Sequence, residues 1–316
     1  MSATPLYQLG GGPIDVNVYA SFYSRTFDAI KKMRDRVKRE GKPFFGQEST
    51  NLSTYKVGEV SPVLDIPPRN NDSETIPLVS APEGYNKTFT KVQYRHGFMV
   101  TREAVEAQKT RMIRSMLTGL PKSEQRLMEL LYAKMFDDAW ATETTGDGSY
   151  VFATDHYYEN PMHGQWSNKA GTGGTFTTAS FYDAWKNLHG RKNSQGFPDP
   201  QNPTAVFYHY ANHEDVAVVH GSQKYPDDNL NAEMDEAVYH DWKMVMGHWL
   251  TDENAWYVQG SDEEGDRGPM EVTHAATTYL PINVSSNPDW ILGKRLRMAK
   301  SVGWVHSRNW YGNEGP

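Results

Sequence analysis

Two short segments combine histidine with carboxylates, a pattern that could hold a metal ion. The two sets are His209, His213, Asp215 and His220, and Asp155, His156 and His163. Imidazoles and carboxylates are frequent ligands of zinc and other divalent metals. His209 and His213 share one face only if residues 208–214 are continuous helix, yet residues 205–210 alternate as a strand does. The spacing therefore favours surface or hydrogen-bonded histidines, and we assign no metal and no cofactor.

Paired carboxylates in a chain rich in Trp and Tyr would suit a carbohydrate-active hydrolase. Such an enzyme holds two carboxyl groups about 5 to 10 Å apart across a cleft. The acids instead cluster in polar, turn-like stretches: Asp227, Asp228, Glu233, Asp235, Glu236 and residues 262–266. Solvated loops explain these clusters, so we assign no catalytic residue. The hydrolase remains an alternative, which predicts a monomer or small oligomer with a deep aromatic cleft.

The common enzyme motifs are missing from the chain. There is no GxGxxG between a strand and a helix, no GxxxxGK(S/T), no HExxH and no GxSxG. The chain also has no Cys, which excludes disulfides, thiolate zinc sites and Cys nucleophiles. These observations favour a protein that is not an enzyme.

Basic residues gather in two places of an acidic chain, which has 39 Asp and Glu against 32 Lys and Arg. Residues 31–42 hold seven basic residues and two acids, and residues 294–308 hold five basic residues and no acid. The first stretch ends an amphipathic pattern over 17–37, which predicts a helix. A basic last turn stabilises a helix by itself, so a solvated face and a phosphate-facing surface are both open there.

The apolar content is low for a folded chain of 316 residues. Leu, Ile, Val and Phe supply 57 residues, about 18%. A net charge of −7 is too small to hold the chain open, and 9 Trp and 18 Tyr supply further apolar mass. No run approaches the ~18 apolar residues of a membrane helix, and the N-terminus has no export signal, so we expect no membrane partner.

The elements that would position these residues follow from periodicity. Residues 1–14 predict a flexible arm, and β-prone runs at 55–60 and 89–100 predict a two-stranded excursion with a polar loop at 67–75. A lone ribbon is marginal in water, so we expect it to pack on another surface.

The remaining elements are helices and short strands. A helix from Thr101 is interrupted at Gly119 and Pro121, and a long amphipathic helix then covers 123–140. Residues 180–189 predict a helix, and 214–220 fit a helix or a strand. The remaining strand-like segments are 204–210, 244–250, 255–258 and 292–311.

One motif resembles a known family. Residues 152–168, FATDHYYENPMHGQWSN, resemble a segment of tailed-phage major capsid proteins, nearest to the Mu-like major head subunits. LTDENAWYV at 250–258 and WVHSRNWYG at 304–312 resemble later strands of that family. The order of these motifs carries the resemblance. The chain departs from it in REAVEAQ at 102–108, and in residues 157–160, where Mu-like subunits have a Gly-rich turn.

The resemblance implies an α+β, Hong Kong 97-like phage capsid fold. Its expected parts are an N-terminal arm and helix at 1–54, an extended β-ribbon loop (E-loop) at 55–100, and a peripheral domain with a long spine helix at 101–195. An axial domain at 196–285 and a return strand with the C-terminus at 286–316 complete it. Some relatives crosslink a loop Lys to a neighbour's Asn, and no motif selects one of Lys56, Lys87 and Lys91 for that chemistry.

The implied function is that of the major capsid protein. Hexamers and pentamers of the chain would form the icosahedral head around double-stranded DNA, assembled in the host bacterial cytoplasm and retained in the virion. The partners would be other copies, packaged DNA through non-specific electrostatics, and portal, scaffolding and decoration proteins. The Trp and Tyr residues would lie at subunit contacts. A cellular nanocompartment shell of the same fold, with a cargo peptide and no DNA, is the further alternative.

Two sets of residues are candidates for these contacts. The loop tip would lie between subunits, and the basic residues would line the inner surface. The loop-tip set is Pro67, Pro68, Arg69, Asn70, Asn71 and Asp72. The basic set is Lys31, Lys32, Arg34, Arg36, Lys38, Arg39, Lys294, Arg295 and Arg297.

Overall fold

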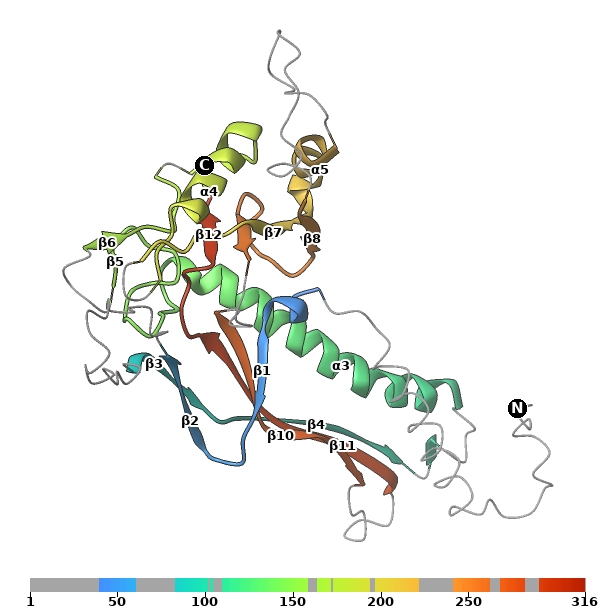
Figure 1. Cartoon of the computed structure of the whole chain (residues 1–316). Coiled ribbons are helices and arrows are strands. Elements are labelled where there is room, and N and C mark those ends of the chain that lie inside the picture. Colours follow the sequence, from blue (N-terminus) through green and yellow to red (C-terminus); the bar gives the residue numbers. More distant parts are fainter. Residues whose placement is uncertain are drawn as a thin grey trace, which may run out of the picture. The chain divides into compact units, whose positions relative to one another are not determined.

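The computed structural model has an α+β architecture built on one long helix and several short sheets (Figure 1). It describes residues 40–60, 83–101, 103–104, 110–158, 164–171, 173–193, 197–221, 241–261, 268–281 and 290–315. The predicted arm, the helix over 17–37, the loop tip at 67–72 and the basic residues at 31–39 lie outside this part.

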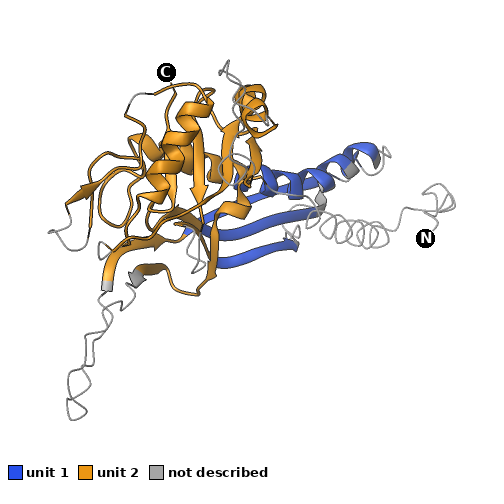
Figure 2. Ribbon diagram, turned by 45° about the horizontal axis from the view of Figure 1, so that its top comes forward, with its two compact units in different colours: residues 1–39, 92–128, 274–300 blue, residues 40–91, 129–273, 301–316 orange. Residues whose placement is uncertain are grey.

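The chain divides into two compact units (Figure 2). Unit 1 comprises residues 1–39, 92–128 and 274–300, and unit 2 comprises residues 40–91, 129–273 and 301–316. The chain passes from one unit to the other within the helix α3 (Thr110–Asp137) and the strands β10 (Pro269–Pro281) and β11 (Trp290–Trp304).

A four-stranded sheet has the order β1-β10-β11-β4. Strand β1 (Gly46–Ser49) runs parallel to the beginning of β10, with Gly46 opposite Met270. Strand β4 (Val92–Thr101) pairs antiparallel with β11, with Arg95 opposite Arg297 and Gly97 opposite Arg295. In unit 1, the buried Glu124 of α3 accepts hydrogen bonds from the hydroxyls of Thr277, at 2.8 Å, and Tyr279. Helix α3 therefore contacts one face of this sheet.

Helix α3 runs through the predicted interruption. It spans 28 residues with Pro121 inside, so the prediction that Gly119 and Pro121 break it is wrong. Pro121 removes one helical hydrogen bond. Leu120, Pro121 and Glu124 are all buried, and the packing of this face outweighs the lost bond. The second half was predicted correctly, up to the short 3-10 turn η3 (Asp138–Trp140).

The ribbon prediction is correct for its first strand and wrong for its second. Strand β2 (Thr54–Val60) pairs with β3 (Glu83–Thr90), and Thr54 lies opposite Thr90. Residues 92–101 form β4 in the other sheet, so the β-prone run at 89–100 belongs to two strands that change partner at Lys91. The segment 292–311 divides in the same way into β11 and β12 (Trp310–Asn313).

Unit 2 contains a second four-stranded sheet, ordered β12-β9-β7-β8. Its other strands are β9 (Trp256–Gly260), β7 (Pro203–His209) and β8 (Lys243–Gly247), close to the predicted segments. Helix α4 (Thr178–His189) begins with a capping box at Thr177 and Ser180, and packs Phe181, Ala184 and Leu188 into the core. Helix α5 (His213–Gly221) follows the short turn η5 (Tyr210–Asn212) and settles the open choice at 214–220 as helix.

Large aromatic side chains fill the core of unit 2. The Phe136 ring lies 4.9 to 5.3 Å, centroid to centroid, from those of Phe207, Tyr257, Trp304 and Trp310. The Trp304 indole donates to the Met135 carbonyl at 3.1 Å. The expectation that Trp and Tyr serve subunit contacts is wrong for these residues, because all of them are fully buried in the subunit. They supply the apolar mass that the composition lacks.

The smaller elements complete unit 2. A 3-10 turn, η2 (Lys42–Phe44), precedes β1, and β5 (His156–Tyr157) pairs with β6 (Gln165–Trp166). No helix in the described part of the chain is long and apolar enough to cross a membrane.

Candidate assembly surfaces and a buried histidine site

The base of the β2–β3 ribbon has one buried and one exposed face. Tyr55, Val57 and Phe89 pack with Val272 and Val305 in a small apolar cluster of unit 2. This part of the ribbon is therefore anchored on its own subunit, whereas the sequence predicted only that it needs a partner surface. The exposed face is polar and consists of Thr54, Lys56, Gly58, Asn86, Thr88 and Thr90.

Lys87 fixes the ribbon to the loop after α3. Its ammonium lies 3.0 Å from a Glu143 carboxylate oxygen, and the side chains are 21% and 22% exposed. The same ammonium donates to the Thr144 carbonyl. Of the three ribbon lysines, Lys87 is thus paired with Glu143 in unit 2, Lys91 is half-buried and Lys56 is exposed.

Three arginines share an exposed face of the sheet in unit 1. Arg295 and Arg297 alternate along β11, and the β4 register places Arg95 opposite Arg297 on the same face. The Arg95 guanidinium donates to Gln93 Oε1 at 2.6 Å. None of the three forms an ion pair with another described residue. Lys294, the third predicted basic residue of this strand, is half-buried on the opposite face.

Arg95 was not predicted, although it belongs to the same face. No other Lys or Arg lies within three residues of it in the sequence, and only the pairing of β4 with β11 brings it beside Arg297. The exposed apolar residue on this side of β4 is Met99, at 41%. Gly97 faces Arg295, and a Cβ there would lie 3.2 Å from the Arg295 Cβ, so a larger residue would crowd the arginine stem.

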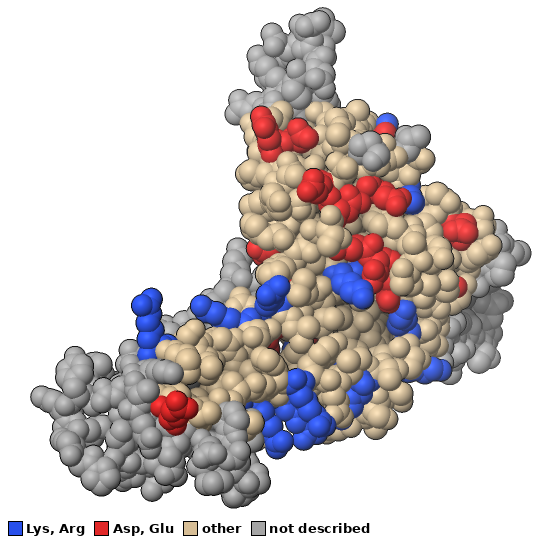
Figure 3. All heavy atoms as spheres, turned by 180° about the vertical axis from the view of Figure 1, so that it is seen from behind, with Lys and Arg blue, Asp and Glu red and all other residues tan. Residues whose placement is uncertain are grey.

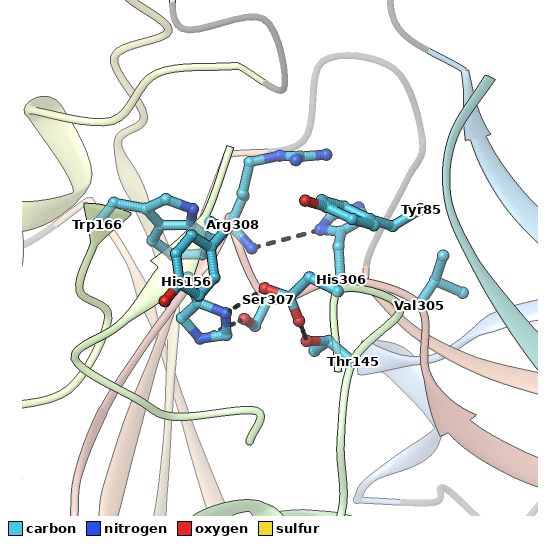
Figure 4. A pocket seen from close by; sticks show the side chains of 10 residues that line it. Tyr85, Thr145, His156, Trp166, Val305, His306, Ser307 and Arg308 are labelled. Carbon is cyan, nitrogen blue, oxygen red and sulfur yellow. Dashed lines mark hydrogen bonds and ion pairs between the residues drawn. The ribbon is translucent and has the colours of Figure 1, made fainter. Parts of the chain in front are cut away.

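A buried histidine joins three segments of unit 2 beside a small pocket (Figure 4). His156 Nδ1 lies 2.8 Å from an Asp147 carboxylate oxygen, and the two side chains are 1% and 7% exposed. His156 Nε2 lies 3.2 Å from the Val151 carbonyl and 3.4 Å from Ser307 Oγ. The His156 ring also stacks on Trp166, with centroids 4.3 Å apart.

Asp147, His156 and Ser307 are the residue types of a catalytic triad, but their geometry does not suit triad catalysis. A triad histidine must take the serine proton at Nε2. The Val151 carbonyl can only accept, so Nε2 of His156 carries a hydrogen and cannot act as that base. Ser307 is also 1% exposed, which keeps a substrate from its hydroxyl. The geometry supports a structural role, in which His156 ties the 147–151 turn to the 305–309 segment.

The charges around this histidine are buried together. Burial alone would raise the pKa of Asp147, but the hydrogen bond and charge of His156, with donors from Thr145 and Ser149, hold that pKa below its ordinary value. The Arg191 guanidinium carbon lies 4.6 Å from the centroid of the Trp166 ring, which also stacks on His156. Burial lowers the Arg191 pKa to about 9. Burial also lowers the Arg308 pKa to about 10, so both guanidinium groups stay charged at neutral pH.

The other histidines that could bind metal are spread over separate partners. His209 Nδ1 accepts from the Ala211 amide at 3.3 Å, and His213 Nδ1 lies 2.9 Å from the Tyr208 hydroxyl. His220 packs against Trp242. Among the residues the structure describes, no three His, Asp or Glu side chains gather as a metal site would require. His163 and the acids at 227–236 and 262–266 lie outside the described residues.

Solved structures share this fold over most of the chain. The procapsid of bacteriophage JBD30 has a TM-score of 0.54 and 8% identity, and the match covers 95% of this chain and 76% of that one. The capsid of cyanophage P-SCSP1u has a TM-score of 0.51 and 8% identity, covering 100% and 95%. A structure from Mycobacterium phage Patience has a TM-score of 0.51 and 8% identity, covering 96% and 89%.

No protein-family model matches the sequence, and no curated protein matches it. The closer likeness to Mu-like subunits therefore stays a prediction. The structural matches cover 95 to 100% of this chain, and they identify the architecture. The chain has the α+β, Hong Kong 97-like fold of capsid proteins.

Proposed function

We propose that this chain is the major capsid protein of a tailed phage, which assembles as hexamers and pentamers into an icosahedral head around double-stranded DNA. The observation that carries the proposal is the fold match to a phage procapsid and a phage capsid over 95% and 100% of the chain. In this proposal the chain acts in the virion after assembly in the host cytoplasm, and its function is mechanical. Portal, scaffolding and decoration proteins are its further partners.

The architecture suits heterologous contacts between copies. A closed ring of identical subunits needs two different patches on each chain that fit one another. We assign the ribbon to one of these patches, because its base is held in unit 2 by Phe89 and Lys87. Residues 61–82, which connect β2 and β3, lie outside the described residues. We assign the loop tip, Pro67–Asp72, to the neighbouring subunit, and residues 101–195 and 196–285 to the peripheral and axial domains.

Expression of the full chain tests the proposal. Sedimentation and negative-stain microscopy should show shells, capsomer rings or tubes of uniform curvature. A well-behaved monomer that hydrolyses a glycoside would overturn the proposal in favour of the hydrolase. Shells that enclose a protein cargo and never DNA in the native host would favour the nanocompartment.

Deletion of Pro67–Thr75 tests the ribbon separately. We expect the deleted chain to fold, with a free energy of unfolding within about 0.5 kcal/mol of the wild type, because the anchoring contacts of Phe89 and Lys87 are kept. The variant should fail to form closed shells by microscopy. Normal shells from a folded variant would refute the proposed contact.

A further inference from the structure

The two units differ strongly in charge. Unit 1 has 18 Lys and Arg against 7 Asp and Glu, a formal charge of +11. Unit 2 has 14 against 32, a formal charge of −18, and the two together give the −7 of the chain. Figure 3 shows Lys and Arg grouped on part of one face, with few acids among them. A net-acidic protein thus contains a strongly basic unit, which the overall charge conceals.

Within unit 1, the sheet face with Arg95, Arg295 and Arg297 carries positive charge that is not neutralised by a described residue. Arg95 and Arg297 lie directly opposite one another, and like charges in that position destabilise a strand pair. Folding alone does not favour this arrangement. An anionic ligand that binds both guanidinium groups would remove the repulsion.

The chemistry of the face suits phosphate. All three cations are arginine, whose planar guanidinium binds phosphate through two parallel hydrogen bonds. Alternate residues of a strand lie about 6.6 Å apart, so Arg295 and Arg297 can contact successive groups of a regular polyanion. Protein–protein interfaces need an apolar centre with few charges, whereas nucleic-acid interfaces are polar and strongly positive. Apart from Met99, the exposed residues of this face on β4 and β11 are polar or Gly.

We propose that the Arg95–Arg295–Arg297 face of unit 1 is the surface that binds the packaged double-stranded DNA, through its phosphates and without regard to base sequence. The inference rests on the proposed capsid function and adds the place of contact. It predicts that this sheet face is turned to the interior of the shell. Acidic unit 2 surfaces of neighbouring copies are the competing partner for the same arginines.

Binding of a duplex of about 30 base pairs of mixed sequence to the purified full chain tests the proposal, with fluorescence anisotropy between about 50 and 200 mM salt. The variant R95Q/R295Q/R297Q should bind at least about tenfold more weakly than the wild type. Its dependence of log K on log salt should be flatter by about 2 to 3, because each lost phosphate contact removes about 0.9 from the slope. Changing the base sequence of the duplex should leave both values unchanged.

The matched control is R111Q/K122Q/R126Q, which removes the same charge from exposed positions on α3 in the same unit. We expect this control to lose much less affinity. Equal losses in the two variants would mean that only net charge matters and would overturn the assigned face. Unchanged DNA binding in the sheet variant would also overturn the assigned face. If that variant binds DNA normally but cannot assemble, the face contacts a neighbouring subunit instead.

Thermal unfolding of both variants verifies that they fold, and microscopy of each sample separates this proposal from the capsid function. Wild-type chains that bind DNA through these arginines but never form shells would contradict the capsid function alone. Shells whose sheet variant binds and packages DNA normally would contradict the DNA surface alone.

Discussion

Unit 2 is acidic and is held together by buried aromatic rings, whereas the described part of unit 1 is a helix and strands that leave an arginine-bearing sheet face exposed. The first arrangement provides stability inside one subunit, since Phe136, Trp304 and Trp310 pack against each other. The second arrangement places positive charge at the surface and adds no stability to the isolated chain. In the proposal above, the two units therefore serve different purposes: unit 2 stabilises the subunit and unit 1 contacts DNA.

The largest effect should come from the aromatic core of unit 2. Phe136→Ala removes a fully buried ring that contacts six other aromatic side chains, and we expect it to lower the free energy of unfolding by about 3 to 5 kcal/mol. Met99→Ala on the exposed face of unit 1 should cost no more than about 0.5 kcal/mol. Urea unfolding measures both losses. Similar losses in the two variants would show that the aromatic core of unit 2 is not the main source of stability.

The buried ion pair of unit 2 should come next. Asp147→Asn leaves His156 without its carboxylate partner, and we expect a loss of about 3 kcal/mol in urea unfolding. Ser149→Ala is the control, because Ser149 contacts Asp147 only through its backbone amide. A loss below that of the control would mean that the pair does not hold this turn.

The same pair predicts a pH dependence. The pKa of Asp147 is lower in the folded chain than the ordinary 3.8, so its stabilisation is complete well above pH 4 and is lost as the pH falls through the lowered folded value. The difference in stability between wild type and Asp147→Asn should therefore shrink in acid. Unfolding measured from pH 7 down to pH 2 tests this, and a difference that stays constant would contradict it.

Helices and strands that depend on neighbouring residues in the sequence were predicted correctly. Apolar residues at helical spacing predicted the helix at 180–189, and the strand-like run at 204–210 predicted β7, which is buried at every position except Thr204. The motif order at 152–168, 250–258 and 304–312 then indicated the fold that the structural matches support.

The remaining features depend on contacts between distant residues. Packing of Leu120 and Glu124 keeps α3 intact through Pro121, and the sequence around Pro121 does not show it. The meeting of Arg95 with Arg297 follows from the pairing of β4 with β11, which are far apart in the sequence, and the change of partner at Lys91 follows from that pairing together with the one between β2 and β3. The buried position of Trp304 and Trp310 could not be told from an interface position, because Trp is suited to both.

The smallest effect should come from the like charges on the sheet of unit 1. Arg95→Gln removes a like charge opposite Arg297 and should stabilise the free subunit by about 0.2 to 1 kcal/mol, with a smaller gain at high salt. Arg111→Gln on α3 is the control and should give no such gain. Thermal unfolding at two salt concentrations measures the difference. A loss of stability in the Arg95 variant would show that this arginine supports the fold.

The two proposals together place copies of this chain in a closed shell with the Arg95–Arg295–Arg297 face of unit 1 inside. Electron cryomicroscopy of particles assembled from the full chain, empty and filled with DNA, tests it most directly. We expect hexamers and pentamers in a closed shell, with Arg95, Arg295 and Arg297 facing the interior and next to DNA density in filled particles. A chain that stays monomeric would overturn the capsid function, and a shell with these arginines on its outer surface would overturn the DNA-binding face.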